Sequence, residues 1–174
     1  MDEQRHPWVR GQVTVPRAVL RELETEAVAA YGREEEACGY LTGPLGGPGG
    51  EAKRADRAHV MPNLANRYHQ LDPEAYPRTG RTYFLLDARK FQRAIEEGEP
   101  AGRPVKVLWH SHLDVGAYFS ETDAAAANMG GEAPAHDLAY LVTSVRHGVI
   151  EEHRLFIWGE AGSYVEATLV IEEE

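Results

Sequence analysis

The sequence predicts an α/β layered domain, in which two main helices lie around a run of short strands. Two segments, residues 17–31 and 88–97, carry apolar side chains at the spacing of an amphipathic helix. A third observation is the run Val105–Leu108, which is apolar, rich in β-prone residues and bounded by Pro104. Three further strands are expected near the end of the chain, at residues 138–145, 149–158 and 164–171.

Length and composition narrow the class of protein. The 174 residues are enough for one domain with a real core, and we expect a single domain over residues 1–174 with a loose lead-in at residues 1–10. The formal net charge of −10 argues against a nucleic-acid surface and against binding to anionic membranes. No apolar run approaches the roughly 20 residues that span a bilayer. Cys38 is the single cysteine, so no internal disulfide can form, and we expect a cytoplasmic location.

The first part of the chain predicts a strand followed by a helix. Residues 12–15 are a strand candidate, and Pro16 stands where a proline commonly opens a helix. The helix is expected over residues 17–31 and ends at Gly32. One face of it is apolar and is expected to pack in the core: Val19, Leu20, Leu23, Ala27 and Ala30.

The next segment, Glu36–Gly43, predicts a buried strand. A glutamate at the start of a strand is ordinarily exposed, so Glu36 has no special meaning from composition alone. Cys38 is expected to be a packing residue rather than a nucleophile, because no basic neighbour in the sequence would lower its pKa. Residues 44–50, with four glycines and two prolines, predict a flexible turn.

The middle of the chain is expected to alternate between strands and a long irregular segment. Residues 52–61 predict a returning strand, and residues 82–86 another short one. Residues 63–80 are polar and irregular, and a loop this long inside a compact domain is expected to be functional or ordered by a partner. Asp87 is expected to cap a helix over residues 88–97.

The central strand leads directly into a group of possible metal ligands. His110 and His112 are two residues apart, so on a strand they point to the same face, roughly 6–7 Å apart, and can share one metal ion. Ser120 opens a helix expected over residues 121–129, and its first turn carries Asp123. Two histidines and a carboxylate would leave the fourth position of a tetrahedral zinc ion open for water, as in catalytic sites.

Each of these residues also has an ordinary explanation. Two histidines at the end of a strand are commonly polar surface, and Ser120 with Asp123 could be a simple helix cap with a favourable charge in the first turn. The other six histidines have no ligand spacing to one another and are expected at the surface or in satisfied core positions: His6, His59, His69, His136, His147 and His153.

The spacing His-Ser-His, seven residues, Ser, two residues, Asp resembles the JAMM, or MPN-plus, metallopeptidases. The match is complete at His110, Ser111, His112, Ser120 and Asp123. The segment that begins at Glu36, Glu-x-Cys-Gly-x-Leu-x-Gly, resembles the stretch that carries the catalytic glutamate of that family. The resemblance implies a mixed β-sheet sandwiched by helices, a layered fold related to that of cytidine deaminases.

The resemblance also implies the chemistry of the site. One zinc ion would be held by His110, His112 and Asp123, and it would lower the pKa of its water towards about 7. Glu36 is the candidate base and then acid, and Ser120 would donate a hydrogen bond to the developing oxyanion. Ser111 is expected to orient the end of the strand rather than to react.

The implied substrate is a ubiquitin-like sulfur carrier protein or its conjugate, cut at a peptide or isopeptide bond after its C-terminal Gly-Gly, as in the stand-alone prokaryotic branch. This chain has Leu113-Asp114 where many such members have Pro-Asp, which leaves the ligands intact. The alternative is a non-catalytic MPN scaffold that binds protein partners, although such relatives usually lack the metal residues. A zinc deaminase needs Pro-Cys-x-x-Cys, which one cysteine cannot supply, and the His-Glu-x-x-His motif is absent.

Overall fold

A computed structural model describes residues 5–46 and 48–174, which form one curled, mixed β-sheet with four α-helices. The strands are β1 (Gln12–Pro16), β2 (Cys38–Thr42), β3 (Arg57–Met61), β4 (Val105–Leu113), β5 (Ala139–Arg146), β6 (Val149–Trp158) and β7 (Tyr164–Glu172). The helices are α1 (Arg17–Gly32), α2 (Ala65–Leu71), α3 (Ala88–Gly98) and α4 (Glu121–Ala127). Two short 3-10 helices lie at Pro7–Val9 and Pro48–Lys53.

The strand order in the sheet is β1-β7-β6-β5-β4-β2-β3. The pairs β1–β7 and β4–β5 are parallel, and the other neighbours are antiparallel. The sheet curls so strongly that its two edges approach each other. An isolated bridge joins Thr14 of β1 to Arg54, which lies just before β3 at the opposite edge. The Ala55 amide also donates to the Thr14 carbonyl at 2.8 Å, so the two edges meet.

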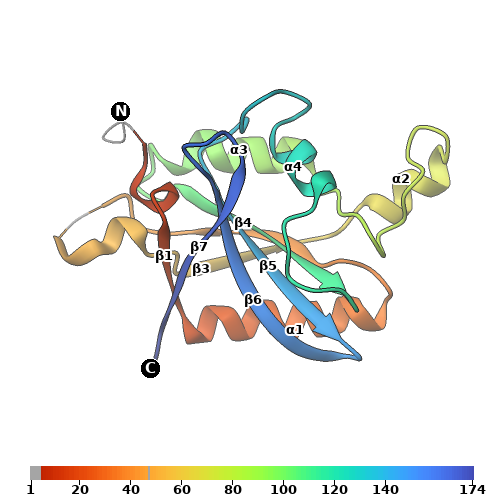
Figure 1. Cartoon of the computed structure of the whole chain (residues 1–174), viewed down its shortest axis with the longest axis horizontal. Helices are drawn as coiled ribbons and strands as arrows, with labels where there is room; N and C mark the ends of the chain where they lie inside the picture. Colours follow the sequence, from red (N-terminus) through yellow and green to blue (C-terminus); the bar gives the residue numbers. More distant parts are fainter. Residues whose placement is uncertain (1–4, 47) are drawn as a thin grey trace.

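Helices cover both faces of the sheet (Figure 1), as the α/β prediction requires. Helix α1 lies along one face and contacts β1, β3, β5 and β6, whereas α3 contacts β4 from the other face. Helix α4 also lies on the α3 side, and α2 projects away from the body of the molecule. No helix in the described part of the chain is long and apolar enough to cross a membrane.

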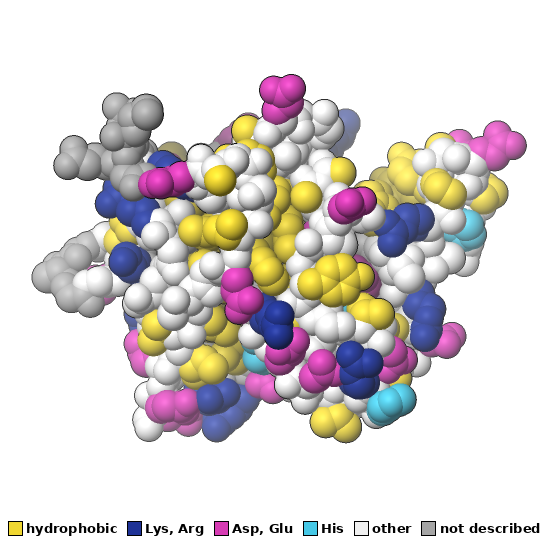
Figure 2. Space-filling view, viewed as in Figure 1, with side chains coloured by type: hydrophobic (Ala, Val, Ile, Leu, Met, Phe, Trp, Pro, Cys, Tyr) yellow, Lys and Arg dark blue, Asp and Glu magenta, His cyan; other side chains and the backbone are white. Residues whose placement is uncertain are grey.

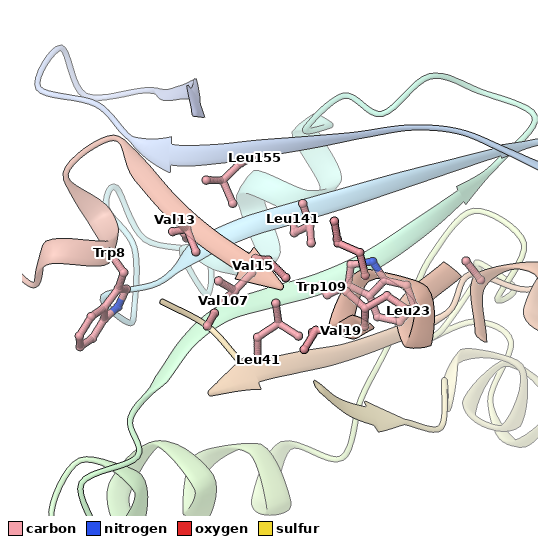
Figure 3. Close-up of a cluster of buried hydrophobic side chains, with 14 of the residues drawn as sticks. Trp8, Val13, Val15, Val19, Leu23, Leu41, Val107, Trp109, Leu141 and Leu155 are labelled. Carbon is pink, nitrogen blue, oxygen red and sulfur yellow. The ribbon is translucent and has the colours of Figure 1, made fainter. Parts of the chain in front are cut away.

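The larger hydrophobic core lies between α1 and the sheet (Figure 3). Trp109 on β4, Leu141 on β5 and Leu23 on α1 are fully buried there. A smaller core lies on the other face, where Phe91 of α3 packs near Tyr140 of β5. Alternate residues of β5 and β6 therefore enter different cores, as the two-residue period of a strand requires.

The sequence located most of the regular structure. The expected strand at 12–15, both main helices and all three closing strands are present, with ends shifted by at most one residue. Asp87 caps α3, with its Oδ1 accepting from the amides of Arg89 and Lys90 at 3.1 Å. Helix α1 begins at Arg17, one residue after Pro16, which remains in β1.

The prediction of a loose lead-in at residues 1–10 is wrong for residues 5–10, which the structure describes. Trp8 and Val9 are buried, and the Trp8 indole donates to the Asp137 carbonyl at 2.9 Å. Residues 1–4 of that lead-in lie outside the described residues. The prediction failed because the partner of Trp8 lies more than a hundred residues away in the sequence, where local pattern gives no signal.

Three other expectations in the middle of the chain need correction. The strand expected over residues 52–61 is confined to β3, and residues 63–80 contain the helix α2. Residues 82–86 do not form a strand; instead the Leu85 amide donates to Asn63 Oδ1 at 3.0 Å. Side-chain hydrogen bonds with one asparagine thus replace the strand ladder that was expected for these residues.

The glycine-rich stretch at residues 44–50 was expected to be a flexible turn, but it runs into the 3-10 helix Pro48–Lys53; residue 47 lies outside the described residues. Lys106 of β4 holds this region from inside the protein. Its side chain is fully buried, and Nζ donates to the carbonyls of Pro44, Ala52 and Arg54 at 2.6–2.9 Å. Burial lowers the Lys106 pKa to about 8.

Candidate metal centre

The two histidines of the motif lie inside β4, at the centre of the sheet, between β2 and β5. His110 and His112 point to the same face, and their Nε2 atoms lie 3.2 Å apart. Both side chains are buried, with exposed fractions of 2% and 4%. The two-residue spacing therefore brings the imidazoles together as expected, although closer than the spacing along the strand because the rings converge.

Neighbouring groups fix the orientation of both rings. His112 Nδ1 lies 2.8 Å from the Gly116 carbonyl, so Nδ1 must carry the proton and the lone pair of Nε2 faces the cluster. The His110 ring stacks on Phe84, with a centroid separation of 4.6 Å. Burial lowers the pKa of His110, although the charge of Asp123 acts in the opposite direction. The lowered pKa favours the neutral imidazole that a metal ligand needs.

Asp123 joins the histidines from the first turn of α4. Its Oδ2 lies 3.2 Å from His110 Nε2 and 3.6 Å from His112 Nε2. The same Oδ2 accepts from the Ser120 amide, and Ser120 Oγ accepts from the Asp123 amide, both at 3.0 Å. This capping box holds the carboxylate in place. Burial would raise the Asp123 pKa, but the imidazoles and the Ser120 amide lower it well below its usual range.

Glu36 enters the same cluster from the segment between α1 and β2. A carboxylate oxygen of Glu36 and one nitrogen each of His110 and His112 lie within 4.8 Å of one another. The Glu36 side chain is buried, and burial together with the charge of Asp123 raises its pKa well above the usual value, against the opposing charge of Arg78.

The backbone of Glu36 is held on both sides. The Glu36 amide donates to the Gly80 carbonyl at 2.6 Å, and Asn63 Nδ2 donates to the Glu36 carbonyl at 2.9 Å. The next amide, that of Ala37, donates to Ser111 Oγ at 2.8 Å. Ser111 therefore ties the glutamate segment to the strand that carries both histidines, which agrees with the orienting role expected for it.

The donor set fits a tetrahedral metal ion. Ligand atoms about 2.0–2.1 Å from a tetrahedral zinc lie about 3.3 Å from one another. The separations among the two Nε2 atoms and Asp123 Oδ2 are 3.2, 3.2 and 3.6 Å. Two neutral imidazoles and one carboxylate are also the ligand types that zinc accepts at catalytic centres. His110, His112 and Asp123 could therefore hold the ion, with Glu36 beside it.

Other residues around the site were not singled out from the sequence. Asn63 is the main one, because it binds Glu36, Tyr83, Ala65 and Leu85 at the same time. Its position at the start of a long loop was the available signal, since asparagine side chains commonly organise turns. Phe84 gave no signal, because its partner His110 is distant in the sequence.

The remaining sequence candidates lie elsewhere or have structural roles. Cys38 is buried, and burial with nearby carboxylates raises its pKa to about 12, so it is a packing residue as expected. Gly39, in the same segment, faces the backbone of β3; an added Cβ would lie 2.4 Å from the His59 carbonyl oxygen. His153 binds Thr143 Oγ1 at 2.7 Å on the α1 side of the sheet.

Comparison with known proteins agrees with this geometry. Residues 16–158 match the family described as prokaryotic homologs of the JAB domain. The chain belongs to this family. No curated protein gives a significant match.

Solved structures share the fold of this JAB domain. A solution structure of a protein from Desulfitobacterium hafniense is 21% identical with a TM-score of 0.65, covering 93% of this chain and 94% of that chain. A second, from Salinibacter ruber, is 23% identical with a TM-score of 0.58, covering 92% of each chain. A crystal structure described as a JAB1/MPN domain protein from Archaeoglobus fulgidus is 15% identical, with a TM-score of 0.49 and coverage of 91% and 99%.

Proposed function

We propose that this JAB domain is a zinc-dependent metallopeptidase that hydrolyses the bond after the C-terminal Gly-Gly of a ubiquitin-like sulfur carrier protein or its conjugate. The observation that carries the proposal is the convergence of His110, His112 and Asp123 at tetrahedral ligand spacing, with Glu36 beside them. A structural zinc site would have four protein ligands, whereas a buried carboxylate next to three ligands suits catalysis. The absence of other cysteines fits a cytoplasmic enzyme.

Each residue of the site would have its own role in the hydrolysis. Zinc at this position would polarise the scissile carbonyl and lower the pKa of its water to about 7. Glu36 takes the proton of the attacking water and passes it to the leaving amine. Ser120 Oγ accepts from the Asp123 amide, so its own O–H remains able to donate to the developing oxyanion. His112, oriented by the Gly116 carbonyl, would hold the ion through Nε2.

The test is intact-mass spectrometry of a ubiquitin-like sulfur carrier extended beyond its Gly-Gly, with zinc-loaded wild type and the Glu36→Gln variant. Wild type should remove the extension, and Glu36→Gln should bind zinc normally but react on the order of 10²–10⁴ times more slowly. Zinc content after dialysis gives an independent readout, and Asp123→Asn should lower it.

The two readouts separate the competing functions. Normal turnover by Glu36→Gln would remove Glu36 from the role of base. Zinc binding without cleavage of extended or isopeptide-linked carriers would favour a scaffold that binds protein partners. Unchanged zinc content in Asp123→Asn would exclude Asp123 as a ligand.

A further inference from the structure

An apolar pocket opens directly beside the candidate metal centre. Its volume is about 250 Å³, and His110 and Asp123 form part of its wall. The rest of the lining comes from the segment before α3, from α3, from β4 and β5 and from α4, and it is mostly aromatic or aliphatic. Hydrophobic side chains gather on the same side of the sheet as α3 and α4 in Figure 2.

The pocket is large enough for an aromatic side chain. A cavity of about 150 Å³ lined by aliphatic and aromatic side chains binds benzene, so this volume exceeds what one ring needs. Phe84, Phe91 and Phe119 line it, and edge or offset contacts between rings favour an aromatic occupant. A glycine would leave this apolar surface uncovered.

A positive charge lies at the edge of the same pocket. The Arg78 guanidinium is 5.6 Å from the ring centroid of Tyr83, a lining residue, and it donates to Thr122 Oγ1 at 2.6 Å, one residue before Asp123. Its second hydrogen bond, also 2.6 Å, goes to the Thr82 carbonyl. A guanidinium has five N–H donors, so these two bonds leave others for a ligand. The Arg78 charge also acts on Glu36, whose pKa it lowers.

We propose that this pocket and Arg78 bind the residue released by the reaction: its large apolar side chain enters the pocket, and its free α-carboxylate pairs with Arg78. The inference rests on the proposed peptidase function and deepens it. The substrate would be a carrier with one apolar residue after Gly-Gly. Hydrolysis breaks that C–N bond, gives the hydroxyl of water to the glycine carbonyl, and gives a proton to the amine of the released residue.

The pocket is assigned to the released residue for two reasons. The proposed residues before the bond are glycines, which have no side chain to fill an apolar pocket. A free carboxylate one residue beyond the bond also needs a cationic partner, because the site itself contains two buried carboxylates, Glu36 and Asp123, and Arg78 can supply that charge. A lysine side chain in an isopeptide would bring only a narrow chain of methylene groups and no adjacent carboxylate.

Binding of the released residue can be measured without turnover. We would titrate the zinc-loaded protein with phenylalanine, alanine and phenylalanine amide and follow ¹H–¹⁵N NMR shifts. Phenylalanine should bind roughly 10- to 150-fold more tightly than alanine, because its ring is buried. Wild type should bind phenylalanine amide more weakly than phenylalanine by a similar factor, because the amide lacks the carboxylate. The Arg78→Gln variant should bind phenylalanine and phenylalanine amide with equal affinity.

Matched variants test the location. Ala126 and its neighbour Ala125 are both exposed residues of α4, but of the two only Ala126 lines the pocket. Ala126→Phe should fill the pocket and lose phenylalanine binding, and Ala125→Phe should retain it. Arg81 is an exposed arginine that pairs with Glu34 and Asp114, so Arg81→Gln is the control for Arg78→Gln. All four variants should keep wild-type zinc content.

Cleavage of synthetic peptides that end in Gly-Gly-Phe or Gly-Gly-Ala completes the test. Faster release of phenylalanine, abolished by Ala126→Phe and not by Ala125→Phe, supports the inference. Equal binding of phenylalanine and alanine, or equal cleavage of both peptides, overturns it and leaves the peptidase standing. Selective binding of phenylalanine without hydrolysis of either peptide supports the pocket but overturns the proposed peptidase function.

Discussion

The two faces of β4 differ sharply although they belong to one strand. Val107, Trp109 and Ser111 point towards α1 and are buried with 1% or less of their surface exposed. His110 and His112 point to the other face, where they form the candidate metal centre beside a hollow of about 250 Å³. The strand period of two thus assigns stability to one face and chemistry to the other.

The difference arises from what covers each face. The 16-residue helix α1 lies along the sheet and closes one side, and even the polar atom of Trp109 is satisfied there by Thr143 Oγ1 at 2.9 Å. The other side is covered by the shorter α3 and by the seven-residue α4, which leave space between them. The face that carries the histidines is therefore only partly covered, which leaves room for a substrate. The face that α1 covers supplies the rigid packing that holds the histidines in place.

The largest effect expected from this comparison is on the closed face. Trp109→Ala should lower the free energy of unfolding by about 3–5 kcal/mol, because it leaves a cavity in the core. Leu108→Ala, one residue away on the open face and only partly buried, should cost clearly less. Denaturant unfolding of both variants measures the difference. Equal losses would show that the two faces contribute equally to stability.

The open face should respond in activity rather than in stability. Ser120→Ala should raise the activation barrier by about 2.7–4 kcal/mol through loss of the oxyanion donor. It should also cost about 1 kcal/mol of stability as a lost helix cap. Asp87→Ala removes the cap of α3 and is the matched control: it should lose similar stability and keep kcat. If both variants keep kcat, Ser120 is only a cap.

Ser111 links the two faces of β4, because its side chain faces α1 and yet holds the segment that carries Glu36. Ser111→Ala leaves the buried amide of Ala37 without its acceptor, which should cost about 1–3 kcal/mol. Because Glu36 immediately precedes Ala37, loss of this hydrogen bond should also displace Glu36 and lower kcat. Ser144→Ala is the control, since Ser144 Oγ is buried without a hydrogen-bond partner among the described residues. A stable but slow Ser111→Ala protein would indicate direct participation in the reaction.

The closed face could be read from the sequence because its signals are local. The apolar stripe of α1 and the alternation in β4 have periods of 3.6 and 2, which any folded environment must respect. The motif from His110 to Asp123 is also local, since the strand and the capping box bring its members together within 14 residues. The position of these residues could therefore be predicted, with Glu36 added by resemblance.

The open face was harder to predict because its walls come from distant segments. Phe84 stacks on His110, and Arg78 binds Thr122, but nothing near either residue in the sequence indicates the partner. Asn63 organises the segment at residues 82–86 through hydrogen bonds with the Tyr83 carbonyl and the Leu85 amide, which is why the expected strand did not form. A pocket depends on such long-range contacts, so it emerges only from the folded structure.

The smallest effect concerns the N-terminal segment, where His6 contacts Asp137 and the residue that follows α3, Glu99. His6 Nδ1 lies 2.5 Å from Asp137 Oδ2, and Nε2 lies 3.0 Å from Glu99 Oε1. Burial would lower the His6 pKa, but hydrogen bonds to Glu99 and Asp137 outweigh it and raise the pKa above 6.5. The stabilisation is therefore complete below pH 6.5 and is lost as the pH rises through the raised pKa.

The measurement is thermal unfolding of wild type and His6→Gln at pH 5.5 and pH 8.5. Wild type should be more stable than His6→Gln at the lower pH, by less than about 1 kcal/mol because the pair is partly exposed. The difference should shrink at the higher pH, where the Trp8 and Arg5 hydrogen bonds still anchor the segment. His69→Gln, in the projecting α2 region, controls for general effects of removing a histidine. A difference that does not change with pH would mean that His6 acts by stacking on Trp8 rather than by its charge.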